Sequence, residues 1–304
     1  MTSATVAIVV VNWRKRGATL DCIGALTRLS SPDWRLVLVD NGCVDFSSGE
    51  VERLAPGGLY LHSPANLGFA GGANLGMRAA LQRGAAWLWF LNNDTLVDTG
   101  ALDALLGVAR RPPGADIVGA KILQRQAPDR LDSVGLDIDL ATGRAWLIGH
   151  DELDRGQYDR LTHPLAVTGC AMLVSRRAAE QLNGFDEAYF AYLEDADFCL
   201  RARASGLRVA CAPRARVLHD RPPARRRRQS ADSLYYATRN HLALLQRHSP
   251  APPWRRKLQE LEVVCRYLMF AARNGEQRRA ALAAVRHGLQ DSRRGVSGPR
   301  HVSS

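Results

Sequence analysis

The chain has no long hydrophobic run, because none of its apolar stretches approaches the roughly 20 residues of a membrane-spanning helix. Its six cysteines are dispersed and include no Cys-x-x-Cys pair, which argues against a disulfide framework or a zinc site. The first apolar run, "VAIVVV", has no basic segment before it and turns polar at Asn12, so no secretion signal is expected. These absences favour a cytoplasmic protein with reduced thiols.

Acidic residues are scarce only in the C-terminal part. Residues 1–220 carry 23 Lys and Arg against 25 Asp and Glu, a net charge of −2, whereas residues 221–304 carry 18 against 5, a net charge of +13. A chain of 304 residues that is 46% hydrophobic is long enough for one large globular domain and a smaller appendage. We expect a domain over residues 1–220, a basic helical region over 221–295 and a disordered tail over 296–304.

Strand-like and helix-like segments alternate over the first 123 residues. Apolar runs such as "VAIVVVN", "RLVLVDN" and "AWLWFLNND" are separated by segments with helical spacing, at 20–29 and 72–83. This alternation predicts an α/β fold with a mostly parallel sheet, in which ligands bind beyond the carboxyl ends of the strands. Asn12, Asp40 and Asp94 each follow such a run, so we expect them to share a site.

The rest of the chain is predicted to contain an insertion, two strands and several helices. Residues 124–164 are polar, with a hairpin around 141–143, and we interpret them as an insertion near the site. A strand in "PLAVTGCAMLVSRR", a helix in "DADFCLRARASG" and a strand that ends at His219 follow. Beyond a Pro/Arg linker, helical patterns appear at 230–247, 255–273 and 276–290.

The segment "NLGFAGGANLGMRAAL", residues 66–81, is rich in glycine and leads into a helix. Glycines allow close backbone approach, and a helix N-terminus offers free N–H groups, so the segment could hold a phosphate or the edge of a nucleotide. It matches neither GxGxxG nor GxxxxGK[ST], and a tight turn between strand and helix explains it equally well.

Asp94, with Asn92 beside it, is a candidate metal ligand. A divalent ion that bridges a diphosphate needs hard oxygen ligands and open positions, although Asn and Asp also occur in turns for backbone reasons alone. His219, at another strand end, could add an imidazole. A carboxylate and an imidazole together suit Mg²⁺ or Mn²⁺.

Glu194, Asp195 and Asp197 place three carboxylates within four residues at the start of a predicted helix. Capping and compensation of the helix dipole explain one or two of them. Crowded carboxylates raise one another's pKa, which suits a general base.

The run "ARRRRQS" could bind nucleic acid, anionic lipid or a diphosphate, and most such runs are simply solvated. The amphipathic segment "LQELEVVCRYLMFAARN" that follows favours a membrane surface or a protein partner. The sequence has no basic face with interleaved aromatics, so we expect no nucleic-acid partner.

In this order, the motifs resemble family 2 glycosyltransferases of the GT-A fold, in the branch of rhamnosyl- and galactofuranosyltransferases. The resemblance covers about residues 5–245 and rests on "VVVNW", "LVLVDNG", "NLGFAGGANLG", "FLNND", the stretch from "VTGCAMLVSRR" to "YLEDADFCLRARASG", "VLHD" and "YYATRNHLALL". The remaining C-terminal residues match only in being basic and helical.

The resemblance implies roles for thirteen residues. One group would bind the donor nucleotide or its diphosphate, namely Asn12, Asp40, Asn66, Gly68, Asn92 and Arg239, the last paired with Asn240. Asp94, in the position of the metal-binding Asp-x-Asp, and His219 would hold the metal. Asp195 would be the catalytic base with Glu194 beside it, and Thr168 and Gly169 would face the acceptor and the donor sugar. The first position of the metal motif is Asn92 instead of Asp, which removes one charged ligand.

The implied activity is an inverting transfer from a dTDP- or UDP-linked sugar, with dTDP-rhamnose suggested first by family association. The acceptor would be a hydroxyl of a small molecule or of a lipid-linked glycan in cell-surface polysaccharide synthesis. We expect the basic C-terminal helices to hold the enzyme at the inner face of the plasma membrane.

Two other classes remain open. A catalytically inactive nucleotide-sugar-binding scaffold would explain Asn92, although Glu194, Asp195 and His219 together argue against decay. A sugar-phosphate nucleotidyltransferase needs a glycine-rich basic loop after the first strand, and "VVVNWRKRGATL" has one glycine there.

Overall fold

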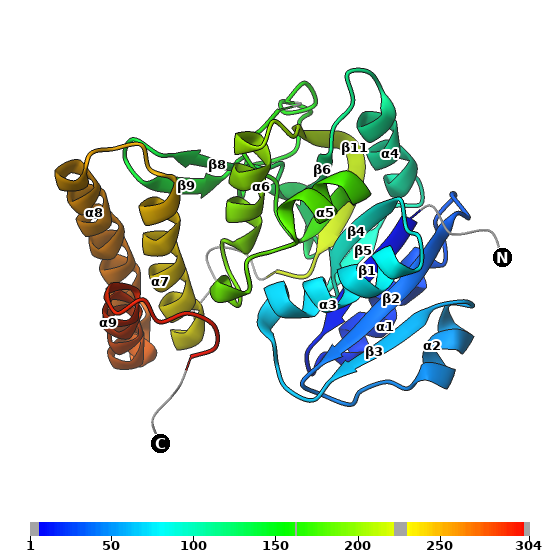
Figure 1. Cartoon of the computed structure of the whole chain (residues 1–304), viewed down its shortest axis with the longest axis horizontal. Coiled ribbons are helices and arrows are strands. Elements are labelled where there is room, and N and C mark those ends of the chain that lie inside the picture. The colour runs from blue at the N-terminus through cyan, green and yellow to red at the C-terminus, as the bar shows by residue number, and fades with distance from the viewer. Residues whose placement is uncertain (1–5, 162, 222–229, 301–304) are drawn as a thin grey trace.

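The computed structural model describes residues 6–161, 163–221 and 230–300 (Figure 1). Within them, a nine-stranded sheet with helices on both faces forms the main body, and three helices form a group beside it. The strands of this sheet are β1 (Val6–Asn12), β2 (Trp34–Asn41), β3 (Leu59–Ser63), β4 (Trp87–Asn92), β5 (Thr95–Val97), β6 (Ile117–Gln124), β7 (Ala127–Ser133), β10 (Ala171–Ser175) and β11 (Val209–His219). The predicted strands and hairpin are confirmed.

The strands follow the order β3-β2-β1-β4-β10-β6-β11-β5, and β7 pairs with β6. β1, β2, β3, β4, β6 and β11 run in one direction, whereas β5, β7 and β10 run in the other. The sheet is therefore mixed. β6 ends at the carboxyl edge and the insertion stays there, so the chain re-enters the sheet from that edge and β10 must run antiparallel to β4 and β6.

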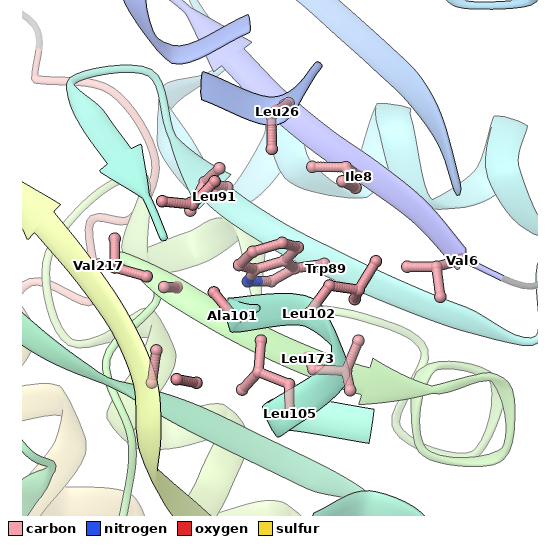
Figure 2. Packing of buried hydrophobic residues seen from close by; sticks show 14 of the residues in the cluster. Val6, Ile8, Leu26, Trp89, Leu91, Ala101, Leu102, Leu105, Leu173 and Val217 are labelled. Carbon is pink, nitrogen blue, oxygen red and sulfur yellow. The ribbon is translucent and has the colours of Figure 1, made fainter. Parts of the chain in front are cut away.

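Helices cover both faces of the sheet because its central strands are apolar on both faces. Alternate residues of a strand point to opposite faces. Trp89 is fully buried and packs on the side of Ile8, Leu26 and Leu102 (Figure 2). Its neighbour Phe90 is buried on the other side. The first face is covered by α1 (Arg16–Leu26), α2 (Ser48–Leu54) and α4 (Ala101–Arg110), and the second by α3 (Gly68–Gln82), α5 (Arg176–Leu182) and α6 (Glu194–Ala204).

The insertion contains a separate hairpin, β8 (Leu136–Asp139) and β9 (Arg144–Leu147), which reaches towards the C-terminal helices (Figure 1). Those helices are α7 (Ala231–His248), α8 (Pro253–Ala272) and α9 (Arg278–Arg293), which pack on one another. The described residues also form two short 3-10 turns, η1 (Glu187–Tyr189) and η3 (Gly275–Gln277). All three helices confirm the predicted patterns. No helix of the described residues is long and apolar enough to cross a bilayer.

Residues 296–304 are predicted to be a disordered tail, and two of the described residues of this stretch make hydrogen bonds to the rest of the protein. The Gly298 N–H donates to the Ala188 carbonyl at 2.9 Å, and the Arg300 N–H donates to the Tyr236 hydroxyl at 2.8 Å. Residues 301–304 and the arginine run 225–228 lie outside the described residues. The domain boundaries stay a prediction.

Candidate active site

The ends of β1, β2 and β4 meet at the carboxyl edge of the sheet, as the sequence predicts. Asn12 stands opposite Asp40 in the parallel register, and its Nδ2 donates to Asp40 Oδ1 at 2.7 Å. Asn93, just past β4, donates from Nδ2 to Asn12 Oδ1 at 3.2 Å and to Thr19 Oγ1 at 2.9 Å. Sequence reasoning missed Asn93, because its two neighbours, Asn92 and Asp94, were the predicted ligands.

Asp40 is buried, and both of its carboxylate oxygens accept hydrogen bonds. Oδ2 accepts from the N–H groups of Asp45 and Phe46, both at 2.9 Å, and from the Tyr60 hydroxyl at 3.1 Å. The ligand atoms of Asp40, Cys43 and Asp45 lie within 4.8 Å of one another and could hold a metal ion. Because donors already occupy both oxygens of Asp40, this trio is less suited to a cation than the Asp94 site.

Asn41, the last residue of β2, fixes the glycine-rich segment and was also missed. Its Oδ1 accepts from the Leu67 N–H at 2.9 Å, and its Nδ2 donates to Asn66 Oδ1 at 3.1 Å and to the Gly68 carbonyl at 2.9 Å. Gly68 has a φ of +71°, and a Cβ there would lie 2.2 Å from the Phe190 carbonyl oxygen. The segment therefore needs glycine at this position for its backbone and for its close approach to residue 190.

Asp94 lies beyond β4 between two cationic side chains. Lys15 Nζ donates to Oδ2 at 2.8 Å, and His219 Nε2 lies 3.4 Å from Oδ1. Oδ1 is buried and has no hydrogen-bond partner among the described residues. Burial raises the pKa of the Asp94 carboxyl, but its interactions with His219 and Lys15 outweigh this effect and hold the pKa well below the usual range.

His219 is oriented by a buried carboxylate of the insertion. Its Nδ1 lies 2.8 Å from Asp132 Oδ2, while Arg221 donates to Asp132 Oδ1 at 3.1 Å and His150 Nδ1 lies 3.3 Å from the same oxygen. Burial raises the pKa of Asp132, but these three partners outweigh it and the pKa is strongly lowered. Sequence reasoning missed Asp132, because β7 is polar and lies inside the insertion.

Asp94 and His219 fit a divalent cation. Asp94 Oδ1 is a buried carboxylate oxygen without a hydrogen-bond partner in the described chain, and it faces an imidazole nitrogen. In many metal sites a carboxylate and an imidazole bind the ion together, and a second carboxylate orients the imidazole. Lys15 is a competing cation on the second oxygen of Asp94. Asn92, half-buried at the end of β4, supplies no charge.

The three carboxylates at the start of α6 have different surroundings. Asp197 is fully buried and ion-paired with Arg201, Arg247 and His248. Burial raises its pKa, but His248, Arg201 and Arg247 outweigh this effect and lower the pKa to about 2. Asp197 therefore joins α6 to α7 and does not act as a base.

Asp195 and Glu194 remain as candidate bases. Asp195 accepts from the Gly169 N–H at 2.9 Å and from the Ala196 N–H at 2.8 Å, and burial raises its pKa. Glu194 is buried, its Oε2 lacks a hydrogen-bond partner among the described residues, and burial together with the charge of Asp195 raises its pKa well above the usual value. A pair with raised pKa values suits proton transfer.

The candidate base and the candidate metal site are joined through two consecutive residues. The Gly169 N–H donates to Asp195, and the Cys170 carbonyl accepts from the Asn92 N–H at 2.9 Å. Thr168, half-buried, precedes them. The two residues just before β10 therefore hold the carboxylate of α6 and the strand end of β4 from adjacent positions in the chain.

Arg239 and Asn240 hold the loop that leads into α6. Arg239 is 2% exposed and donates to the carbonyls of Ala188, Tyr189 and Gly298. Asn240 Nδ2 donates to the carbonyls of Tyr189, Ala191 and Tyr192 at 2.7–2.8 Å. These are structural contacts, and the role of Arg239 in donor binding stays a prediction.

Comparison with known proteins identifies the class to which this fold and site belong. The family described as "Glycosyltransferase like family 2" matches residues 4–240, so the chain belongs to this family. The resemblance drawn from the sequence is confirmed. The protein is an enzyme of the glycosyltransferase class.

Among curated relatives, the chain is 28% identical over 236 residues to the N-acetylglucosaminyl-diphospho-decaprenol L-rhamnosyltransferase of Mycobacterium tuberculosis, covering 70% of this chain and 75% of that protein. It is 37% identical over 121 residues to galactofuranosyltransferase GlfT1 of the same organism, covering 38% and 39%. It is 32% identical over 152 residues to the O-antigen biosynthesis protein RfbC of Myxococcus xanthus, covering 49% of this chain but only 12% of that protein.

Solved structures share the fold. The mannosyltransferase PcManGT of Pyrobaculum calidifontis, in complex with GDP-Man and Mn²⁺, has a TM-score of 0.58 at 15% identity, with 96% of this chain and 76% of that chain covered. TarS of S. aureus with UDP-GlcNAc has a TM-score of 0.59 at 12% identity, with 96% and 81% covered. The predicted α/β GT-A fold is therefore confirmed.

Proposed function

We propose that the chain is an inverting glycosyltransferase that moves a sugar from a dTDP- or UDP-linked donor to a hydroxyl of a lipid-linked glycan. The observation that carries the proposal is the junction at Gly169 and Cys170, which ties Asp195 to the strand end that bears Asp94. A base and a site for a charged leaving group, held by adjacent residues, are what a single displacement needs.

Asp195 is proposed to take the proton of the acceptor hydroxyl as that oxygen attacks the anomeric carbon. Its raised pKa places it nearer to the working pH than an ordinary Asp, and the Gly169 N–H fixes the orientation of the carboxylate. Burial and the charge of Asp195 raise the pKa of Glu194 beside it. We therefore propose that Asp195, and not Glu194, carries the negative charge of the pair. Thr168 and Gly169 are proposed to face the acceptor and the donor sugar.

Asp94 and His219 are the residues that would hold Mg²⁺ or Mn²⁺, with Asn92 and Lys15 beside them. When bound, such an ion supplies positive charge that offsets the negative charge on the leaving diphosphate. Lys15 is positively charged, like the ion, and already contacts Asp94. If a cation took its place on the carboxylate, Lys15 would be free to contact a phosphate oxygen of the donor.

Asn12, Asp40, Asn66 and Gly68 are proposed to line the nucleotide pocket. Since the oxygens of Asp40 are already hydrogen-bonded to Asn12, Tyr60 and the backbone of residues 45–46, we propose that Asp40 acts mainly by shaping this pocket. For Arg239 we propose that any effect on the donor passes through the loop that it holds.

The donor and the acceptor are proposed from the relatives. The rhamnosyltransferase relative, which matches 70% of the chain, carries in its name an L-rhamnosyl donor group and a decaprenol-linked acceptor. This supports dTDP-rhamnose as the donor, a polyprenyl-diphosphate sugar as the acceptor, and work at the cytoplasmic face of a membrane.

A thermal-shift panel tests the donor site without knowledge of the acceptor. UDP, dTDP, GDP and their sugars are each added with Mn²⁺, Mg²⁺ or EDTA to wild type, Asp94→Ala and the control Asp98→Ala, an exposed carboxylate past β5. At about 100 times its Kd a ligand adds about 2.7 kcal/mol of apparent stability. We expect a metal-dependent shift for one nucleotide that Asp94→Ala loses and Asp98→Ala keeps. The absence of any shift would favour the inactive scaffold.

A further inference from the structure

Helix α8 carries an apolar stripe on the face that points away from the protein. Trp254, Leu258, Leu261 and Met269 are 53–66% exposed, and the thiol of Cys265 is exposed among them. Their spacings of four, three, four and four residues place all five on one side of an α-helix. Isolated exposed apolar residues are ordinary, but a stripe along a whole helix marks an interaction surface.

The opposite face of α8 is already used within the protein. Val263 and Ala271 are fully buried, and Gln259 Nε2 donates to the Leu140 carbonyl of the hairpin turn at 2.9 Å. Figure 1 shows α8 at the outer edge of the molecule, with α7 between it and the sheet, and α8 packs on both α7 and α9. The stripe is therefore a second apolar face, which within the described chain stays open to solvent.

Basic side chains flank the stripe. Lys257 is exposed on one side of it and Arg255 and Arg273 are exposed on the other, at the angles that 100° per residue assigns to them. The acidic Glu262 nearby is paired with Arg266 at 2.7 Å. These residues belong to the segment 221–304, whose net charge is +13, from 18 basic and 5 acidic residues.

We infer that α8 docks on the surface of an anionic lipid bilayer, with its axis parallel to the membrane. Trp254, Leu258 and Leu261 enter the boundary between headgroups and acyl chains, and Arg255 and Lys257 contact lipid phosphates at its rim. The charge argues against a second copy of the chain as the occupant, because two such surfaces would bring like charges together. Docking goes beyond the proposed transfer activity and does not depend on it.

Flotation of the full chain with vesicles tests the inference. We expect wild type to float with phosphatidylglycerol–phosphatidylcholine vesicles and to stay soluble with phosphatidylcholine alone. Leu258→Gln with Leu261→Gln is expected to weaken binding by about tenfold or more, since it removes two inserted side chains. The control Val44→Gln changes a residue that is 78% exposed in the loop between β2 and α2, outside the helical group, and is expected to float like wild type.

A charge variant keeps the test valid if the stripe variant fails to fold. Arg255→Gln with Lys257→Gln is expected to weaken binding about 25-fold, at about fivefold for each charge near the surface. Its control, Arg110→Gln with Arg111→Gln, removes two exposed charges at the end of α4 and is expected to bind like wild type. Equal losses in both variants would mean that the overall charge is responsible, and would overturn the assignment to α8.

Cys265 allows an independent test of docking. It can be labelled selectively, because the other cysteines are buried or half-buried. An environment-sensitive fluorophore on Cys265, in a Cys43→Ser background, is expected to shift to the blue with anionic vesicles and to be quenched by spin-labelled lipid. Wild type that stays soluble with anionic vesicles overturns the inference. A second result would also overturn it: wild type is a dimer in light scattering, the stripe variant is a monomer, and neither protein floats. The stripe would then be covered by a second copy of the chain.

Discussion

His219 Nδ1 and Asp132 Oδ2 lie 2.8 Å apart, and this contact directs the other ring nitrogen of His219 to within 3.4 Å of Asp94. A carboxylate that holds an imidazole in this way fixes both its tautomer and the direction of its free nitrogen. The insertion, which follows β6 in the chain, thus completes a site whose other members come from β4 and β11.

Asp132→Asn is expected to weaken Mn²⁺ binding about 10- to 100-fold, because His219 loses the partner that orients it. Mn²⁺ titration followed by thermal shift, without nucleotide, measures the change. The control His150→Gln alters another contact of Asp132 without touching His219, and is expected to bind Mn²⁺ like wild type. Equal weakening in both variants would show that Asp132 acts only through the stability of the insertion.

Asp195→Asn is expected to lower kcat about 10²- to 10⁴-fold and to leave donor binding intact, since the amide keeps the contact with the Gly169 N–H but takes no proton. Turnover with acceptor and the thermal shift with donor are measured side by side. Near wild-type turnover would remove Asp195 from the mechanism.

Asp197→Asn is the matched control on the same helix. It breaks buried ion pairs with Arg201, Arg247 and His248, and is expected to lower the free energy of unfolding by about 2–3 kcal/mol at neutral pH. The turnover of the folded fraction should stay close to wild type, which separates loss of stability from loss of chemistry.

Gly68→Ala is expected to destabilise the protein by about 2 kcal/mol or more and to raise KM for the donor. The added Cβ would lie 2.2 Å from the Phe190 carbonyl oxygen at a φ of +71°, so either the glycine-rich segment or the loop at 190 must move. Urea unfolding checks the prediction. Gly24→Ala, in α1 with no atom within 4 Å of the new Cβ, is expected to stabilise by about 0.5–1 kcal/mol.

The free energy of unfolding is expected to fall as the pH drops from about 7 towards 4, in part through His241 on α7. Burial lowers the pKa of His241 to about 4, so the unfolded chain takes up a proton at about pH 6.5 while the folded chain does not. The contribution over this window is about 3 kcal/mol. Urea unfolding at pH 7 and 4.5 should show a smaller loss for His241→Gln. The exposed control His62→Gln should follow wild type.

The sequence predicted the strands, most helices and the shared edge for a simple reason. Apolar runs such as "WLWFL" are buried on both faces of the sheet, and the polar residues that follow them fall at strand ends. The direction of β10 could not be predicted, since an apolar strand looks the same whichever way it runs. It follows instead from the insertion that precedes it.

The missed site residues share a different cause. Lys15 and Asp132 stand 79 and 38 residues from Asp94 in the chain, and neither follows a strong apolar run. The sequence predicts Asn41 only as the end of a strand, although its side chain holds Asn66 and Gly68. Such contacts depend on the direction of a side chain in three dimensions, which periodicity does not contain.

The insertion contacts two separate parts of the protein within its first half. Asp132 holds the imidazole of His219. A few residues further along the chain, the carbonyls of Leu140 and Ala141 accept hydrogen bonds from Gln259 of α8. The hairpin therefore acts as a spacer of fixed length between the helical group and the carboxyl edge of the sheet. With α8 docked on a membrane, substitutions in the turn of the hairpin would change the height of the active site above the bilayer. They would alter turnover although the turn is remote from every proposed ligand.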